Sequence, residues 1–316
     1  MVHRKSGLLS APCTLLLILF VTTGCGLFSP DEEGTAYVAG EVYFGRNDYI
    51  EYRAGDLPVI LSAPHGGLLE PSEIPDRTWG TTAHDRRTEE LARAISSAIS
   101  ARMGGYPHII ICHLHRRKLD ANRAIQEAAQ GNQWAEKAWY EYHDFILAAK
   151  AAVAEEHGSG FYIDLHGHGH KIQRLELGYM LSASDLTLPD TALNSPTYRN
   201  KSSIRTLVME TGLSLPALVR GPTSLGSLLE DLGFPSVPSA GQPNPGGAPY
   251  YSGGYSTGRH GSSDGGSISG VQIECNWEGV RSTETERAAF SQAMAEALET
   301  FLETHYSFEP LALEHR

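Results

Sequence analysis

The segment "FYIDLHGHGH", residues 161–170, carries the pattern from which the fold is predicted. Apolar residues alternate with other residues from Phe161 to His166, as in a buried strand, and the glycines that follow end the strand where a loop begins. In α/β sheets, loops after strands hold ligand-binding and catalytic groups. Asp164 and the histidines are therefore candidates for a metal site. A histidine-rich surface loop explains the segment better when it is taken alone, so further ligands must come from elsewhere in the chain.

Similar strand patterns alternate with helical patterns along most of the sequence. Strands are expected at 48–55, 57–65, 108–115, 161–166, 175–182 and 270–277, and helices at 83–104, 124–157 with a break near Gly131, 202–211, 223–232 and 282–306. This alternation predicts an α/β protein, a three-layer α/β/α sandwich around a mixed, mostly parallel sheet. We expect a single domain over residues 37–310. The segment 235–270 is rich in Gly, Pro, Ser and Tyr, and its aromatic residues favour an active-site loop or lid over a disordered linker.

The N-terminus has the pattern of an export signal. A cationic start at residues 3–5 is followed by the apolar run "TLLLILFV", 14–21, and by "TTGC", 22–25. This resembles a bacterial lipoprotein signal, with residues 1–24 removed, Cys25 lipidated and 25–36 as a tether. The resemblance implies a membrane-anchored protein facing the periplasm or the cell exterior. Ordinary secretory cleavage and an uncleaved anchor are the alternatives.

Composition and charge restrict the partners. The chain has 316 residues, 41% of them hydrophobic, and a formal net charge of -12, with 25 Lys and Arg against 37 Asp and Glu. Such a surface repels nucleic acid, so an anionic substrate needs a local arginine site. After signal removal and lipidation only Cys112 and Cys275 remain, and they form either a disulfide or two buried thiols. The absence of a Cys-x-x-Cys spacing argues against a thiolate zinc site.

A second strand end supplies the missing metal ligands. The predicted strand at 57–65 runs into "PHGGLLEPSE", 64–73, which offers His65 and Glu70. The two glycines allow a tight turn, so that an imidazole and a carboxylate can converge with His166 on one ion. Two histidines and one carboxylate leave a fourth position for water, which is the arrangement of catalytic zinc. Taken singly, His65 is equally well explained as a turn histidine and Glu70 as a solvated acid.

Several motifs resemble the N-formylglutamate amidohydrolase family. They are "SAPHGG", 62–67, "DRRTEELA", 85–92, "LDANR", 119–123, "DLHGHGH", 164–170, "YYSGGYSTGRHG", 250–261, and "VQIECN", 271–276. This family is similar in fold to the zinc carboxypeptidases, whose metal is held by a histidine, a glutamate and a distant histidine. The resemblance implies His65, Glu70 and His166 as zinc ligands. Glu70 fits the longer "HGGxxE" spacing of related phage poly-γ-glutamate hydrolases, with Glu73 and Asp85 as substitutes.

The resemblance also implies a general base. Glu274, in the buried strand around 270–277, matches the catalytic glutamate by motif, and Gln272 shares its face of the strand. Glu278 is the substitute, and a structural pair between Glu274 and a buried arginine is the alternative reading. Asp164 lies on the same side of its strand as His166 and is a candidate to orient a ligand histidine.

Substrate recognition is expected from arginine, because a guanidinium grips a carboxylate with two hydrogen bonds. Arg123, with Asn122 beside it, matches the Asn-Arg pair of the family, and Asp120 is expected either to fix Arg123 or to cap a helix. Further candidates for substrate contact are Tyr255, His260 and His168.

These residues together predict a zinc-dependent amidohydrolase. Its expected substrate is an N-acyl amino acid of the N-formylglutamate type or a small peptide that bears a carboxylate. The alternatives are an extracytoplasmic metallocarboxypeptidase, a hydrolase of poly-γ-glutamate or cell-wall peptides, and a catalytically silent ligand-binding domain of the same fold.

Overall fold

The computed structural model describes residues 37–310. The predicted signal peptide, Cys25 and the tether fall on residues 1–36, outside the described residues. The described residues form one compact unit. Within the described part, no helix combines the length and apolar character that a membrane crossing requires.

The described chain forms one eight-stranded sheet in the order β1-β2-β4-β3-β5-β8-β6-β7. The strands are β1 Val42–Phe44, β2 Ile50–Arg53, β3 Val59–Ala63, β4 His108–Cys112, β5 Gly160–Gly167, β6 Leu175–Gly178, β7 Ser236–Val237 and β8 Ile268–Cys275. The central strands β4, β3, β5 and β8 are parallel, and antiparallel pairs join β1 to β2, β2 to β4 and β8 to β6. The predicted mixed, mostly parallel sheet is therefore confirmed.

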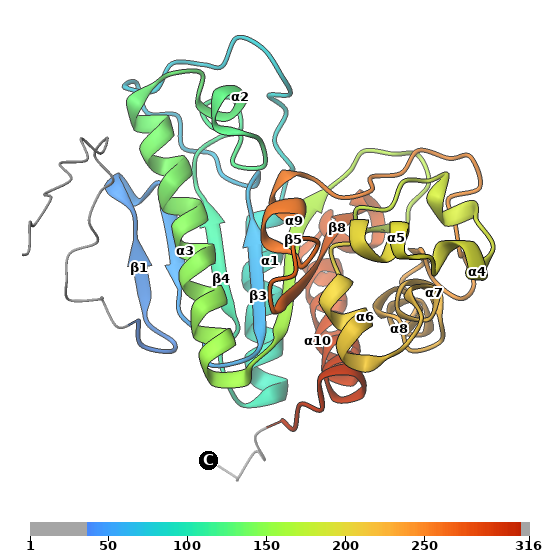
Figure 1. Ribbon diagram of the computed structural model, residues 1–316. Helices are drawn as coiled ribbons and strands as arrows, with labels where there is room; N and C mark the ends of the chain where they lie inside the picture. The colour runs from blue at the N-terminus through green and yellow to red at the C-terminus, as the bar shows by residue number, and fades with distance from the viewer. Residues whose placement is uncertain (1–36, 311–316) are drawn as a thin grey trace, which may run out of the picture. The chain divides into compact units, whose positions relative to one another are not determined.

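Helices cover both faces of this sheet, which confirms the three-layer architecture (Figure 1). Helices α1 Thr88–Met103 and α10 Glu284–Tyr306 pack together on one face, and α3 Gln133–His157 covers the other face with α9 Tyr255–His260. The remaining helices are α2 Ile125–Ala129, α4 Asp190–Leu193, α5 Pro196–Lys201, α6 Arg205–Thr211, α7 Leu215–Arg220 and α8 Leu225–Asp231. Short 3₁₀ turns lie at Arg46–Asp48 and Asp185–Thr187.

Side chains cap the N-termini of the long helices α3 and α10. At α3, the side chain of Asn132 accepts hydrogen bonds from the backbone N–H groups of Trp134 and Ala135. At α10, Thr283 and Glu286 form a reciprocal capping box. Such caps pair backbone donors that would otherwise lack partners, and each stabilises a helix by about 1 kcal/mol.

Side chains along the central strands alternate between the two faces of the sheet. One face is apolar, and the other becomes polar toward the strand ends. Leu61, Ile163 and Val271 point into the core beneath α1 and α10. On the opposite face, Ile60 and Tyr162 belong to the core beneath α3. The next residues along that face are polar, with Ser62 beside Asp164, Asp164 beside Gln272, and His166 beside Glu274 in the strand register. This register gathers polar groups at the carboxyl edge of the sheet.

The segment 235–270 differs from the expected loop because it contains β7, α9 and the start of β8. Helix α9 has only six residues, one of them glycine, so it shows no apolar period that a sequence reading could detect. Cys112 and Cys275 are free, buried thiols, so of the two expectations for this pair the structure contains the thiols and no disulfide.

A partly buried ion pair joins α1 to the sheet. Glu51 on β2 is almost fully buried, and Arg93 on α1 donates to its two oxygens at 2.8 and 2.7 Å. Burial by itself would raise the pKa of Glu51, but hydrogen bonds from His113 and Arg93 outweigh it and lower the pKa from 4.5 to about 2. The folded state therefore favours the ionised form of this carboxyl group.

We expect the Glu51 pair to stabilise the fold at neutral pH and to lose this effect in acid. Because the folded pKa is lower than the unfolded one, the contribution is complete above about pH 4.5 and disappears as the pH falls toward 2. Glu51→Gln should lower the free energy of unfolding by about 1–3 kcal/mol at pH 7 and by less at pH 3. Denaturant titrations at both pH values measure this difference in the free energy of unfolding.

Glu89→Gln, which removes a more exposed partner of Arg93, is the control and should lower the free energy of unfolding by less than about 1 kcal/mol. Equal losses for Glu51→Gln at both pH values would contradict the prediction.

Candidate metal centre and active site

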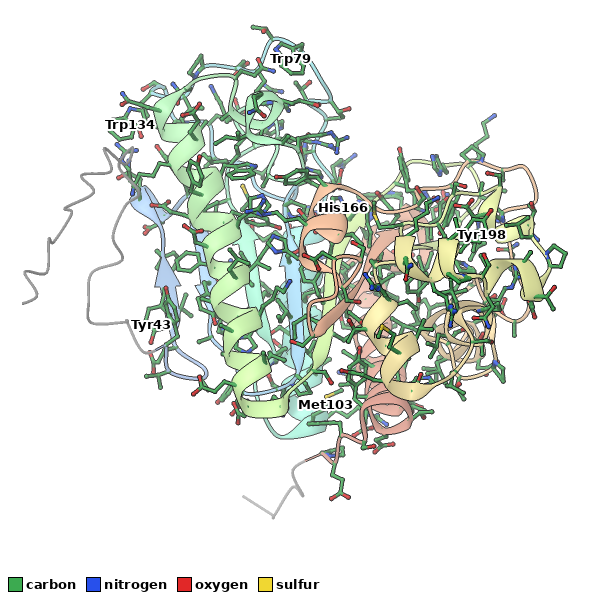
Figure 2. The ribbon with its side chains drawn as sticks, in the orientation of Figure 1. Tyr43, Trp79, Met103, Trp134, His166 and Tyr198 are labelled. Carbon is green, nitrogen blue, oxygen red and sulfur yellow. The ribbon has the colours of Figure 1, made fainter. Side chains whose placement is uncertain are left out.

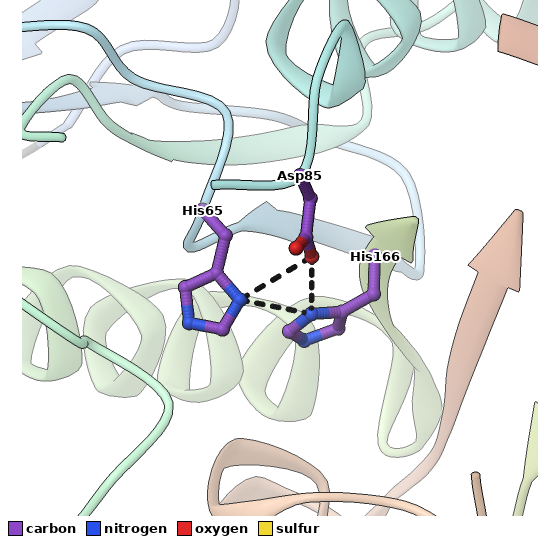
Figure 3. A group of neighbouring side chains, drawn as sticks. All are labelled: His65, Asp85 and His166. Atoms are coloured by element: carbon purple, nitrogen blue, oxygen red, sulfur yellow. Dashed lines mark hydrogen bonds and ion pairs between the residues drawn. The ribbon is translucent and has the colours of Figure 1, made fainter. Parts of the chain in front are cut away.

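Three buried side chains converge at the carboxyl edge of the central strands. His65 follows β3, Asp85 lies just before α1, and His166 is on β5. Figure 3 shows the three groups pointing at one another. Nδ1 of His65 lies 3.2 Å from Nδ1 of His166, and Oδ2 of Asp85 lies 3.3 Å from the first nitrogen and 3.1 Å from the second. In Figure 2, His166 lies close to α9.

Nε2 of each histidine faces a carboxylate, and Nε2 of His166 also lies 3.1 Å from Nδ2 of Asn122. Nε2 of His65 lies 2.7 Å from Oδ1 of Asp120, and Nε2 of His166 lies 3.0 Å from Oδ2 of Asp164. A neutral imidazole has one N–H, so donation from Nε2 leaves a lone pair on Nδ1. Both Nδ1 lone pairs then face each other and the Asp85 carboxylate. In this metal-binding protonation state, three acceptors face one another, and a cation between them would satisfy all three.

The charges around the cluster also favour a positive charge within it. Burial acts to lower the pKa of His166, but the carboxylates of Asp164 and Asp85 hold that pKa well above its ordinary value. Burial acts to raise the pKa of Asp85, but His65 and His166 hold that pKa well below its ordinary value. The cluster therefore attracts positive charge, either as a proton or as a metal ion.

The donor set fits a divalent metal ion without rearrangement. Zinc makes bonds of about 2.0–2.2 Å to nitrogen and carboxylate oxygen, and in a tetrahedron such bonds place the donors about 3.3 Å apart. The three observed separations, 3.1 to 3.3 Å, are close to this value. Histidines that donate their second N–H to carboxylates are the usual metal-binding form, because the carboxylate fixes the ring and raises its basicity.

The carboxylate beside the two histidines is Asp85, one of the expected substitutes, and Glu70 lies away from them. Glu70 is exposed and faces Arg117 at 3.5 Å, and the substitute Glu73 is bound by Arg46 and Tyr49. After the Gly66-Gly67 turn, the backbone of Leu69 pairs alongside β4 and leads Glu70 away from the histidines. The backbone N–H of Asp85 donates to the carbonyl oxygen of His65 and so holds Asp85 beside it.

A second cluster, His168, His170 and Glu176, has similar residue types but different chemistry. Nε2 of His168 lies 2.9 Å from the carbonyl oxygen of Arg174, and its Nδ1 accepts the backbone N–H of His170. Both ring nitrogens are therefore committed. The same contacts turn His168 away from the expected role in substrate binding.

Glu274 lies beside His166 in the register of β8 and β5. Burial raises the pKa of Glu274 to about 8, with the charges of Asp85 and Glu176 acting in the same direction and His166 opposing them. Gln272 donates from Nε2 to Oε1 of Glu274 at 2.9 Å, which fixes the carboxyl group. Burial and the neighbouring carboxylates therefore favour the protonated form of Glu274. The expected substitute, Glu278, is exposed on the loop after β8.

His65, Asp85, His166 and Glu274 line one cavity of about 170 Å³. Arg116, Asn122 and Arg123 also line it, together with Tyr251, Gly253 and Gly254 from the segment before α9. A Cβ atom on Gly254 would lie 2.5 Å from Nδ2 of Asn122, so this wall has no room for a side chain at that position. The cavity therefore brings arginines and the histidine-carboxylate cluster together.

Two further expected substrate residues lie elsewhere. Tyr255 borders a separate surface hollow with Leu147 and Arg259, and His260 is buried, with its Nε2 2.8 Å from Nδ1 of His143. Tyr251 lines the cavity instead. Its ring stacks on His170, and its backbone N–H donates to Glu176. Nothing in the tyrosine-rich segment distinguishes Tyr251 from Tyr255 by residue pattern.

Asp120 contacts His65 and Arg116, which was not predicted from the sequence. It was expected to fix Arg123 or to cap a helix, but it is fully buried and accepts from His65 and from Nε of Arg116 at 2.9 Å. Arg123 instead lies 3.4 Å from Glu127 and is partly exposed at the cavity. Asn122 accepts from the backbone N–H of Ser256, so it links the metal cluster to α9.

Known structures show which class of protein has this fold. No protein-family model and no curated protein sequence matches the chain. N-formylglutamate amidohydrolase from Ralstonia eutropha JMP134 matches with a TM-score of 0.53 at 11% identity, over 81% of this chain and 97% of that chain. The gene product Atu2144 from Agrobacterium tumefaciens gives 0.46 at 14% identity, over 81% and 95%. Succinylglutamate desuccinylase from Chromobacterium violaceum gives 0.37 at 10%, over 87% and 72%. The first match shows that the chain shares its fold with an amidohydrolase.

The identity of the third ligand can be tested by metal binding. Asp85→Asn should weaken zinc binding by more than about 100-fold, beyond the effect typical of outer partners, because it removes a charged donor. Glu70→Gln should leave the affinity unchanged, since its carboxylate faces Arg117. Competition with a chromophoric zinc chelator measures both constants, and thermal unfolding checks that each variant is folded. Loss of binding in Glu70→Gln with retention in Asp85→Asn would reverse the assignment.

Proposed function

We propose that this protein is a zinc-dependent amidohydrolase that cleaves an amide bond in an N-acyl amino acid or a small carboxylate-bearing peptide. The observation that carries the proposal is the convergence of His65, Asp85 and His166 in one small cavity with Glu274. The cluster offers three donors to a cation, and Glu274 would supply the proton-transferring group that amide hydrolysis needs. The shared fold with an amidohydrolase supports the same class of reaction.

A zinc ion held by these three residues would activate a water molecule and polarise the amide carbonyl. The protein supplies the remaining steps. Glu274, in its carboxylate form, takes a proton from the attacking water and then donates it to the leaving nitrogen. The pKa of Glu274, which burial raises, would be lower beside a bound dication, so the carboxylate form needed for the first step would be present at neutral pH. Gln272 holds one oxygen of Glu274 and leaves the other free for the proton.

The cavity indicates the size and charge of the substrate. Its volume of about 170 Å³ suits one amino-acid residue with a small acyl group. Arg116 is tied to Asp120, whereas Arg123 lies partly exposed and is the better group to bind a free carboxylate. This local positive charge matters because the chain as a whole carries a net charge of -12.

A longer peptide is the second candidate substrate. A surface hollow bordered by Leu147, Met180, Tyr255 and Arg259 reaches Gly254, which also lines the cavity. An extended chain that occupies both would suit a hydrolase of cell-wall peptides or of poly-γ-glutamate. We further propose that the enzyme acts outside the cytoplasm through a lipidated Cys25, on the pattern of residues 1–25.

Glu274→Gln tests the proton-transfer role. It should lower kcat by about 10²–10⁴-fold and leave zinc affinity nearly unchanged, because an amide keeps the shape of the carboxyl group but cannot carry the proton. The assay follows amine release from N-formyl and N-acyl amino acids, short peptides and poly-γ-glutamate. Glu278→Gln is the control and should stay active, since Glu278 lies outside the cavity. A zinc-loaded wild-type protein that binds these compounds without cleaving any of them would instead support a silent binding domain.

Arg123→Ala tests the carboxylate site separately. For substrates with a free carboxylate, kcat/KM should fall by about 10–100-fold, the effect of losing a charge-assisted hydrogen bond. For the corresponding amides the value should change little. Arg117→Ala, at an exposed arginine paired with Glu70, is the matched control. An equal loss on both substrate types would show that Arg123 does not read the carboxylate.

A further inference from the structure

Beneath the metal cluster, the Asp164 carboxylate has a different partner on each oxygen. It is fully buried on β5. Its Oδ2 lies 3.0 Å from Nε2 of His166, and its Oδ1 lies 2.8 Å from Oγ of Ser62 on β3. Oγ of Ser62 in turn lies 2.7 Å from the hydroxyl of Tyr162. These four side chains form a continuous buried chain that ends at a proposed metal ligand.

The chemistry of these groups fixes the direction of every hydrogen bond in the chain. An ionised carboxylate only accepts, so the Ser62 hydroxyl must donate its one proton to Asp164. Ser62 then has only lone pairs left, so the Tyr162 hydroxyl must donate to Ser62. From the other side, His166 in its metal-binding form, with the proton on Nε2, donates to Asp164, and Nδ2 of Asn122 lies 3.1 Å from the same nitrogen. Reversing any link would leave Asp164 facing a lone pair.

The strand register explains why these residues meet. Ser62 is paired with Asp164, and Ile60 with Tyr162, between the parallel strands β3 and β5. Tyr162, Asp164 and His166 alternate along β5 and therefore share one face. The hydroxyls of Ser62 and Tyr162 lie in the interior, so water does not replace them as partners of the carboxylate.

We infer that Ser62 and Tyr162 are positioning residues for the metal ligand His166, acting through Asp164. By donating toward Asp164, they stabilise its negative charge in a buried setting and hold its Oδ2 in line with Nε2 of His166. This fixes the ring so that Nδ1 faces the cation. The inference rests on the proposed metal site, and it adds two residues that touch neither the ion nor the substrate.

Zinc affinity is the decisive measurement, because it needs no known substrate. Replacing groups that orient a metal-binding histidine typically weakens binding about 10–100-fold. Ser62→Ala should weaken zinc binding by about tenfold, and Tyr162→Phe, which acts one link further away, by a smaller factor. Chelator competition at fixed pH gives the constants. If Ser62→Ala does not fold, the near-isosteric Tyr162→Phe still tests the chain.

Two matched controls separate positioning from general loss of stability. Ser203 is a fully buried serine whose hydroxyl donates to the carbonyl oxygen of Gly270, and Tyr179 is a buried tyrosine outside the cluster. Ser203→Ala and Tyr179→Phe should leave zinc affinity unchanged even where they lower the melting temperature.

Adding Ser62→Ala to the Asp164→Asn variant tests whether Ser62 acts through Asp164. An amide no longer needs two donors, so Ser62→Ala should add little to the loss already caused by Asp164→Asn. Independent, additive losses would show that Ser62 acts by some other route and would overturn the inference. Equal zinc affinity in wild type, Ser62→Ala and Tyr162→Phe would overturn it as well, while leaving the proposed hydrolase intact. A wild-type protein that binds no zinc would overturn both, whereas a zinc-binding but inactive one would overturn only the proposed activity.

Discussion

The unfavourable approach of three lone pairs is the constraint on which the site depends. Nδ1 of His65, Nδ1 of His166 and Oδ2 of Asp85 lie within 3.1 to 3.3 Å of one another in a buried position. Such groups remain together only if a cation is shared among them or if the surrounding fold holds them there. The fold does hold them, because Asp120 and Asp164 bind the outer nitrogens and the backbone of His65 binds that of Asp85. Preorganisation of this kind is what a metal centre needs, since little rearrangement is required on binding.

The parallel strands β3, β5 and β8 provide the geometry on which this depends. Their register sets Ser62, Asp164 and Gln272 side by side, and His166 beside Glu274. One residue of slippage would turn all of these groups toward the apolar core under α1 and α10. The large cores on both faces therefore do more than stabilise the protein, because they also fix the side of the sheet on which polar groups can appear.

Local pattern in the sequence was enough to predict the layers and several parts of the site. Alternation followed by glycine located His65 and His166 at strand ends, and an acid within an apolar strand marked Glu274. The placement of Asp85 rather than Glu70 beside the histidines could not be predicted in this way, because it depends on Leu69 pairing with Leu114, a contact between distant parts of the chain. The same limit applies to Asp120, whose partners His65 and Arg116 are set by tertiary packing. Tyr251 and Tyr255 are alike in sequence and are separated only by where α9 begins.

The segment that carries Tyr251 is attached to the molecule independently of the metal cluster. Its backbone is held by Glu176 and Met180, next to β6, whereas the three converging groups come from β3, β5 and the loop before α1. The three converging groups and the cavity wall that carries Tyr251 therefore come from separate pieces of chain. Substitutions at Tyr251 would reshape the cavity from a segment that contributes none of those three groups.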